Sequence, residues 1–128
     1  LSERVWLKSG AYLVIQPTEA LTVVDVNTGK NVAKKEMQEN FLRVNKEAAE
    51  EIARQLRLRN LSGMVLVDFI NLTSKSAEEE LLKTFRAALQ KDPVPAQLID
   101  MTALGLVEVT RKKIKRPLHE IFPDGLGF

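Results

Sequence analysis

The sequence predicts an α/β (α+β) domain in which a mixed β-sheet packs against two main helices, in the order β-β-β-α-β-α-β-β. Three observations predict this fold. The 128 residues suit one domain. Short apolar runs rich in β-branched residues accompany two amphipathic helical patterns. Finally, a strand, a long helix and a second strand follow one another between residues 20 and 70. Such a crossover is right-handed and makes its two strands parallel.

The start of the chain predicts three strands in an antiparallel meander. Residues 4–7 and 11–15 are short β-rich runs, and Ser9-Gly10 between them is typical of a hairpin turn. The third run, residues 20–26, is rich in β-branched residues. It stops at a cluster of turn-forming residues, Asn27-Thr28-Gly29-Lys30.

Residues 35–59 predict a long amphipathic helix. Its apolar side chains recur at spacings of three and four, which forms one stripe along the helix. The stripe consists of Phe41, Ala48, Ala49, Ile52, Ala53 and Leu56. The run that follows, residues 64–70, is apolar almost without interruption. Such a run predicts a central strand that is covered on both faces.

The second half of the chain predicts another helix and two short strands. The helical pattern covers residues 76–91, and Ser76 with Glu79 has the spacing of a capping box. Prolines directly after it end the helix, because proline lacks the amide donor and restricts the residue before it. The two further strands are expected at residues 97–99 and 106–109.

The end of the chain changes in composition. Five of the six residues from 111 to 116 are Lys or Arg. The last twelve residues contain two prolines and two glycines, which predicts a poorly ordered tail. We therefore expect one domain over residues 1–116 and a C-terminal tail over residues 117–128.

Composition narrows the possible chemistry. The chain has no Cys, which excludes disulfides, thiolate zinc sites and cysteine nucleophiles, and its single His, His119, rules out a His-rich metal cage. A net charge of +2 is too close to zero to indicate a nucleic-acid partner by itself. No apolar run approaches the roughly 20 residues that span a bilayer, and the N-terminus is not a signal peptide. We expect a cytoplasmic piece of a larger protein, whose chemistry depends on carboxylates, hydroxyls, amides or backbone.

Two aspartates interrupt this apolar pattern. Asp25 and Asp68 each lie near the C-terminal end of an otherwise apolar strand. If the two strands are parallel, both carboxylates emerge at the edge where open α/β sheets bind ligands. Two neighbouring carboxylates repel, and a cation such as Mg²⁺, which takes one or two carboxylates, relieves the repulsion. Asn27 would point to the same face as Asp25. The spacing also leaves open that each Asp pairs with Lys or Arg, or caps a turn.

Four segments resemble the ribonuclease E/G family. Residues 18–30 resemble its first acidic strand motif, and residues 45–63 resemble its long helix. Residues 67–70 lie where the family has its second acidic strand, and residues 105–111 are similar to a later segment. The match extends over most of residues 4–116.

The resemblance implies the DNase-I-like subdomain that carries the catalytic site of this family. It assigns Asp25 and Asp68 as catalytic Mg²⁺ ligands and Asn27 as their support, in the hydrolysis of single-stranded, typically AU-rich RNA to a 5′-phosphate and a 3′-hydroxyl. It also implies that an RNA-binding S1 domain and a 5′-sensor region precede this subdomain, and that a Cys-Pro-x-Cys zinc link follows it. Whether the full-length protein forms a homo-oligomer stays open.

The sequence departs from the family pattern in three places. Asn71 stands where Asp is common, Ala103-Leu104-Gly105 where Arg-Phe-Gly is common, and Val44 where Thr is common. These departures keep a second interpretation open, a non-catalytic module of the same family that binds RNA or a partner domain.

Some further side chains are candidates for contact with RNA. The basic candidates are Lys30, Arg111, Lys112 and Lys113. A basic run can equally be solvated or contact a neighbouring domain. Trp6 and Tyr12 can pack on each other across the predicted hairpin or stack on bases, and we favour the packing.

Overall fold

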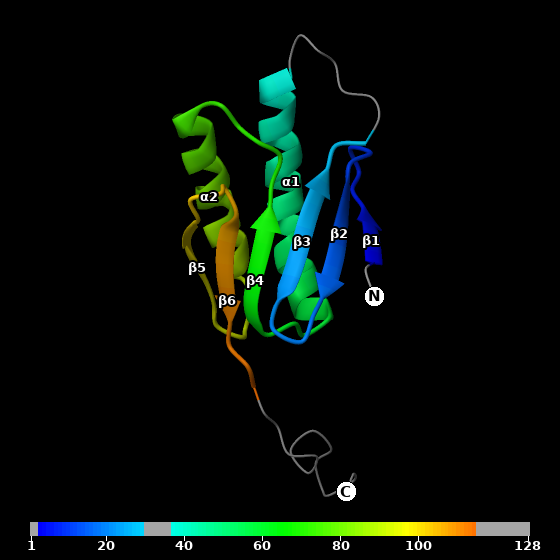
Figure 1. The fold of residues 1–128 in the computed structure, drawn as a ribbon, viewed down its shortest axis with the longest axis vertical. Helices are drawn as coiled ribbons and strands as arrows, with labels where there is room; N and C mark the ends of the chain where they lie inside the picture. The colour runs from blue at the N-terminus through cyan, green and yellow to red at the C-terminus, as the bar shows by residue number, and fades with distance from the viewer. Residues whose placement is uncertain (1–2, 30–36, 115–128) are drawn as a thin grey trace, which may run out of the picture.

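Six strands and two helices make up the part of the chain that the structure describes, residues 3–29 and 37–114 of a computed structural model (Figure 1). The elements are β1 (Glu3–Trp6), β2 (Tyr12–Pro17), β3 (Thr22–Asn27), α1 (Met37–Leu58), β4 (Gly63–Asp68), α2 (Lys75–Leu89), β5 (Ala96–Met101) and β6 (Val107–Arg111). The predicted fold class and element order are confirmed, and every boundary lies within two residues of the prediction. The predicted tail, residues 117–128, lies outside the described residues.

The strands form one mixed sheet in the order β1-β2-β3-β4-β6-β5. Four neighbouring pairs are antiparallel, and the pair β3–β4 is parallel. In Figure 1 the arrowheads of β3 and β4 point to the same edge of the sheet, and α1 lies between these strands in the sequence. The crossover and the parallel pairing that the sequence predicts are confirmed.

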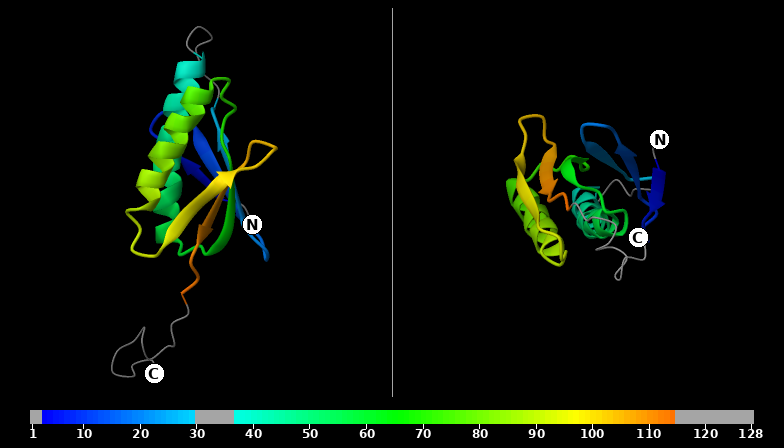
Figure 2. Two further views of the ribbon diagram at one scale, coloured as in Figure 1. Left: turned by 90° about the vertical axis from the view of Figure 1, so that its left-hand side faces the viewer. Right: turned by 90° about the horizontal axis from the view of Figure 1, so that it is seen from below.

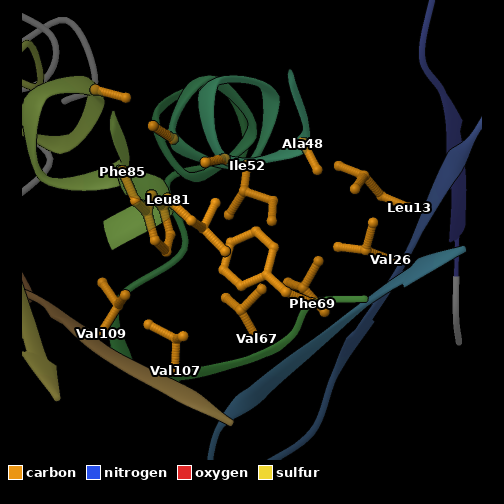
Figure 3. Close-up of a cluster of buried hydrophobic side chains, with 14 of the residues drawn as sticks. Leu13, Val26, Ala48, Ile52, Val67, Phe69, Leu81, Phe85, Val107 and Val109 are labelled. Carbon is orange, nitrogen blue, oxygen red and sulfur yellow. The ribbon is translucent and has the colours of Figure 1, made fainter. Parts of the chain in front are cut away.

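Both helices pack on one face of the sheet (Figure 2). Alternate residues of the four central strands turn towards the helices and are buried. They are Leu13, Ile15, Val24, Val26, Val65, Val67, Val107 and Val109. Figure 3 labels five of them, with Phe69 in the middle of the cluster and Phe85 reaching in from α2. The rings of these two residues contact each other edge to face, with their centroids 5.5 Å apart.

The opposite face of the sheet, here called the open face, is covered by no helix among the described residues. Strand β4 is central, as predicted, but the expectation that it is covered on both faces is wrong. Met64 is 40% exposed on the open face, and Leu66 is half-buried there. Apolar residues on a half-exposed face produce the same unbroken run as a strand covered on both sides. The sequence pattern alone therefore could not separate the two cases.

Helix α2 begins one residue earlier than predicted, and its cap is a different serine. Ser74 is the N-cap, and its Oγ accepts a hydrogen bond from the backbone N–H of Ala77 at 3.3 Å. Ser76 lies inside the first turn, so the predicted capping box from Ser76 to Glu79 is wrong. Both serines have a hydroxyl that can cap a helix, and only the extended backbone of Ser74 places its hydroxyl there.

Candidate metal centre

Asp25 and Asp68 lie side by side on the two parallel strands. They are register partners in the β3–β4 ladder, which places their Cα atoms about 4.8 Å apart. Val24 and Val67, the residues before them, are buried against the helices. Because side chains alternate along a strand, both carboxylates point to the open face. Asp68 ends β4 and Asp25 lies two residues before the end of β3, so the pair occupies the carboxyl edge predicted from the crossover.

The two carboxylates interact electrostatically. The pKa of Asp68 is raised above its ordinary value, first by partial desolvation of the carboxyl group and then by the negative charge of Asp25. Both effects disfavour the ionised form of Asp68. A cation bound between the two residues would offset both.

Asn27 lies on the same face, beside Asp25. Its Nδ2 donates a long hydrogen bond of 3.4 Å to Oδ2 of Asp25. The amide therefore lies against this carboxylate, and its own oxygen stays available as a further ligand or as an acceptor for water.

The donor set of this edge fits Mg²⁺. Two carboxylates and one amide are hard oxygen donors, and Mg²⁺ is commonly held by one or two carboxylates together with waters and substrate phosphate oxygens. Within residues 3–29 and 37–114, no group of three or more His, Cys, Asp or Glu side chains could hold a metal ion. The edge therefore suits an ion shared with water and a phosphate, and does not suit a closed cage of protein ligands.

Asn45 fixes the chain directly after Asp68. This residue of α1 is fully buried. Its Oδ1 accepts a hydrogen bond from the backbone N–H of Ile70 at 3.0 Å, and its Nδ2 donates to the carbonyl oxygen of Ile70 at 2.8 Å. Sequence reasoning assigned Asn45 no role. It lies four residues from both Phe41 and Ala49 of the apolar stripe, and a polar residue at such a position indicates a buried, hydrogen-bonded side chain.

Two hollows flank the carboxylates. One, of about 260 Å³, lies beside Asp68 between the start of α2 and the β5–β6 turn, and it includes Asn71 and Leu104, two of the positions that depart from the family pattern. The other, of about 470 Å³, adjoins Asn27 and reaches the β1–β2 hairpin. A larger hollow of about 680 Å³ lies between β1 and α1, away from both aspartates. The two carboxylates, and not the volume of a hollow, mark the candidate centre.

The predicted basic contacts do not gather at this centre. Lys112 and Lys113 are exposed beyond the end of β6. Register pairs the end of β6 with Gly63, at the start of β4, which is about 17 Å along the strand from Asp68. Lys30 lies outside the described residues.

Arg111 has a different position from the one that its basic neighbours suggest. Its side chain is 3% exposed and forms an ion pair with Asp92 at 2.8 Å, whose side chain is 1% exposed. It also donates to the side chain of Asn60 at 3.0 Å and to the carbonyl oxygen of Leu61 at 2.9 Å. The guanidinium is thus occupied within the protein, and we leave Arg111 out of the proposed RNA contacts.

Comparison with known proteins identifies relatives of this chain. A model of the ribonuclease E/G family matches residues 1–114. Ribonuclease E of Nostoc sp. is 48% identical over 124 residues, which are 97% of this chain and 18% of that protein. Ribonuclease E of Synechocystis sp. is 47% identical over 95% of this chain and 18% of that protein. Ribonuclease G of Escherichia coli is 42% identical over 94% of this chain and 25% of that protein.

The chain thus spans 18% to 25% of the length of these curated relatives. The matched segment contains all the elements described above, including the parallel strands that carry Asp25 and Asp68. The resemblance found in the strand and helix motifs is confirmed, and this chain belongs to the ribonuclease E/G family.

Proposed function

We propose that this chain is the DNase-I-like, Mg²⁺-binding catalytic subdomain of an endoribonuclease that hydrolyses phosphodiester bonds of single-stranded RNA. The observation that carries the proposal is the register pairing of Asp25 with Asp68 at the carboxyl edge of two parallel strands. The names of the relatives, ribonuclease E and ribonuclease G, support the reaction class. Because the chain spans at most 25% of these relatives, other parts of a full-length protein would contribute to RNA binding.

Residues of this chain would do three things in the reaction. Asp25 and Asp68 would hold the ion from the open face of the sheet, while Asn27 donates a hydrogen bond to one carboxylate. A bound Mg²⁺ supplies Lewis-acid polarisation of a phosphoryl oxygen and lowers the pKa of its water. Asn45 holds the segment after Asp68 before any ligand binds. Ligands that are already in place need little rearrangement when the metal and the phosphate arrive.

The described basic side chains that are proposed to contact RNA phosphates lie away from the two carboxylates. Lys112 and Lys113 lie at the opposite edge of the sheet from the carboxylates, so they would contact RNA away from the cleaved bond. Lys30 lies outside the described residues and stays a candidate RNA contact because it follows β3 closely in the chain. Affinity for RNA depends on many phosphate contacts. We therefore expect the isolated chain to fold but to cleave RNA poorly, and cleavage at the rate of an intact family enzyme would contradict this.

Charge-neutralising variants of the two aspartates test the proposal. In a full-length protein, Asp25→Asn and Asp68→Asn should each abolish Mg²⁺-dependent cleavage of a labelled single-stranded oligoribonucleotide. Without metal, each variant should be as stable as the unmodified protein or slightly more stable, because one of two repelling charges is gone. Asp100→Asn, at an exposed position of β5, is the matched control and should cleave normally. Full cleavage by both site variants would overturn the metal assignment.

The alternative is a module of the same family that binds RNA or a partner domain without cleaving. Asn71 and Leu104, which both line the hollow beside Asp68, favour it. This alternative predicts that the unmodified full-length protein binds the oligoribonucleotide and leaves it intact at any Mg²⁺ concentration. Cleavage that depends on Asp25 and Asp68 would exclude it.

A further inference from the structure

Two aromatic rings and a guanidinium form a stack on the open face, next to the carboxylates. Trp6 and Tyr12 are partners across the β1–β2 ladder, and their ring centroids lie 4.9 Å apart at an angle of 50°. The guanidinium carbon of Arg4 lies 4.4 Å from the ring centroid of Tyr12 and 5.8 Å from that of Trp6. The expected packing of the two rings on each other is confirmed.

This packing leaves most of the tryptophan in water. Trp6 is 62% exposed, although a tryptophan can bury about 150–250 Å². An aromatic ring that the fold holds in place and leaves exposed has a flat face free to accept another flat group. The guanidinium of Arg4 adds a positive charge to the same surface, on a face where the nearby aspartates are negative.

The stack is connected to the candidate metal centre through Asn27. Trp6, Tyr12 and Arg4 line the 470 Å³ hollow, together with residues at the end of β3. Tyr12 is the register partner of Asn27, and Asn27 donates to Asp25. By strand geometry, the Cα atoms of Tyr12 and Asp25 are about 8 Å apart, one strand across and two residues along.

Two turns hold the floor of this hollow rigidly. Gly29 has φ +80°, and a Cβ at this position would lie 2.7 Å from the carbonyl oxygen of Gly10. Since both glycines line the hollow, the β1–β2 turn and the end of β3 are packed as closely as glycine permits. This contact packs the β1–β2 turn, which precedes Tyr12, against the end of β3, which carries Asn27.

We propose that Trp6, Tyr12 and Arg4 form a stacking subsite for a base of single-stranded RNA, next to the phosphate that a Mg²⁺ ion held by Asp25 and Asp68 would contact. The identity of the ligand rests on the function proposed above. Aromatic side chains beside an arginine stack on bases of any sequence, because every base has a π-face. The subsite therefore contributes affinity and position to the RNA without selecting a sequence.

The fluorescence of Trp6 tests the subsite directly, because it is the only tryptophan of the chain. The 128-residue chain is titrated with a single-stranded oligoribonucleotide in EDTA, so that no cleavage occurs. An abasic oligomer of the same length and charge is the matched ligand. The base-containing oligomer should quench Trp6, and the abasic one should not. Equal quenching by both would overturn the proposal, because it would indicate contact with phosphates alone.

Variants distinguish base stacking on Trp6 from non-specific contact of RNA with the protein surface. Trp6→Leu should weaken oligonucleotide binding, measured by fluorescence anisotropy of a labelled RNA, by about 5- to 150-fold, while Trp6→Phe should retain most of the affinity. Ile99→Ala changes another apolar residue on the opposite edge strand, 46% exposed, and should bind normally. Circular dichroism verifies that each variant is folded. Unchanged affinity in both Trp6→Leu and Tyr12→Leu would overturn the subsite.

The stacking proposal and the catalytic proposal fail in different experiments. Asp25→Asn should still allow oligonucleotides to quench Trp6, although it should lose cleavage. If Asp25→Asn and Asp68→Asn both cleave normally while Trp6 is quenched, the metal assignment is wrong and the stacking subsite stands. If Trp6 of a full-length protein does not respond to RNA and is shielded from a soluble quencher, another domain occupies this surface, and the stacking proposal is wrong.

Discussion

Asn45 offers the sharpest test of how the fold supports the centre. Asn45→Ala removes the side chain that binds both backbone groups of Ile70. A buried polar group that loses its partner costs about 1–3 kcal/mol, and two groups are affected. Because Ile70 is half-buried and not fully enclosed, we expect the lower part of the summed range, a loss of about 2–4 kcal/mol in the free energy of unfolding.

Urea denaturation followed by far-ultraviolet circular dichroism measures this loss. Asn40→Ala is the matched control, since it removes the same amide from a surface bond with Arg43 on the same helix. It should cost less than about 0.5 kcal/mol. A second readout is the affinity for Mg²⁺, measured by calorimetry, which should fall about 10- to 100-fold in Asn45→Ala, as when the support of a metal ligand is lost. Equal stability of the two variants with unchanged Mg²⁺ affinity would refute the reasoning.

Three further predictions concern the supporting structure. Arg111→Met should lower the free energy of unfolding by about 3–5 kcal/mol, because it leaves the buried Asp92 without its cation. The control Lys112→Ala should change the free energy of unfolding by less than about 0.5 kcal/mol. Equal effects of the two variants in urea denaturation would contradict the buried ion pair. Burial is the largest single effect and raises the pKa of Asp92, but the hydrogen bonds from Arg111 and from the backbone of Val94, together with the charges of Arg111 and Arg57, outweigh it, so the net pKa lies below its ordinary value. The folded state therefore binds this proton less readily than the unfolded state. The contribution of Asp92 to the free energy of unfolding is complete above about pH 4 and is lost as the pH falls through the lowered pKa. Acid denaturation of Asp92→Asn should lack this pH-dependent loss of stability. Gly29→Ala should destabilise the protein more than Gly105→Ala, because both have positive φ but a Cβ at position 105 meets nothing within 4 Å; equal losses would refute the close contact of the two turns.

Most of the fold was predictable because its determinants are local. The hairpin, the two amphipathic helices and the parallel pairing of β3 with β4 each follow from a short pattern and the crossover rule. The centre was predictable for the same reason, since Asp25 and Asp68 interrupt apolar strands that the crossover aligns. The N-cap of α2 could not be predicted, because Ser74 and Ser76 are chemically equivalent and only the backbone conformation determines which of them caps the helix.

Arg111 and Asn45 show what composition cannot reveal. Arg111 stands at the start of a basic run, but it also continues the buried alternation of Val107 and Val109 along β6. The alternation along the strand turns the side chain of Arg111 into the protein, and Asp92, from a turn distant in the sequence, forms an ion pair with it. For Asn45 the partner is a backbone segment 25 residues away, which no local pattern contains.

The register of β4 against β3 makes the spacing of the two carboxylates a product of the core. A slip of one residue would turn Asp68 towards the helices and bring Val67 out into water. Such a slip would expose the buried side of the whole strand, so the valines beside the aspartates keep the two carboxylates at one separation. Substitutions on the open face can therefore change the chemical surroundings of the two carboxylates without changing their separation, as long as the inward alternation of Val65 and Val67 is kept.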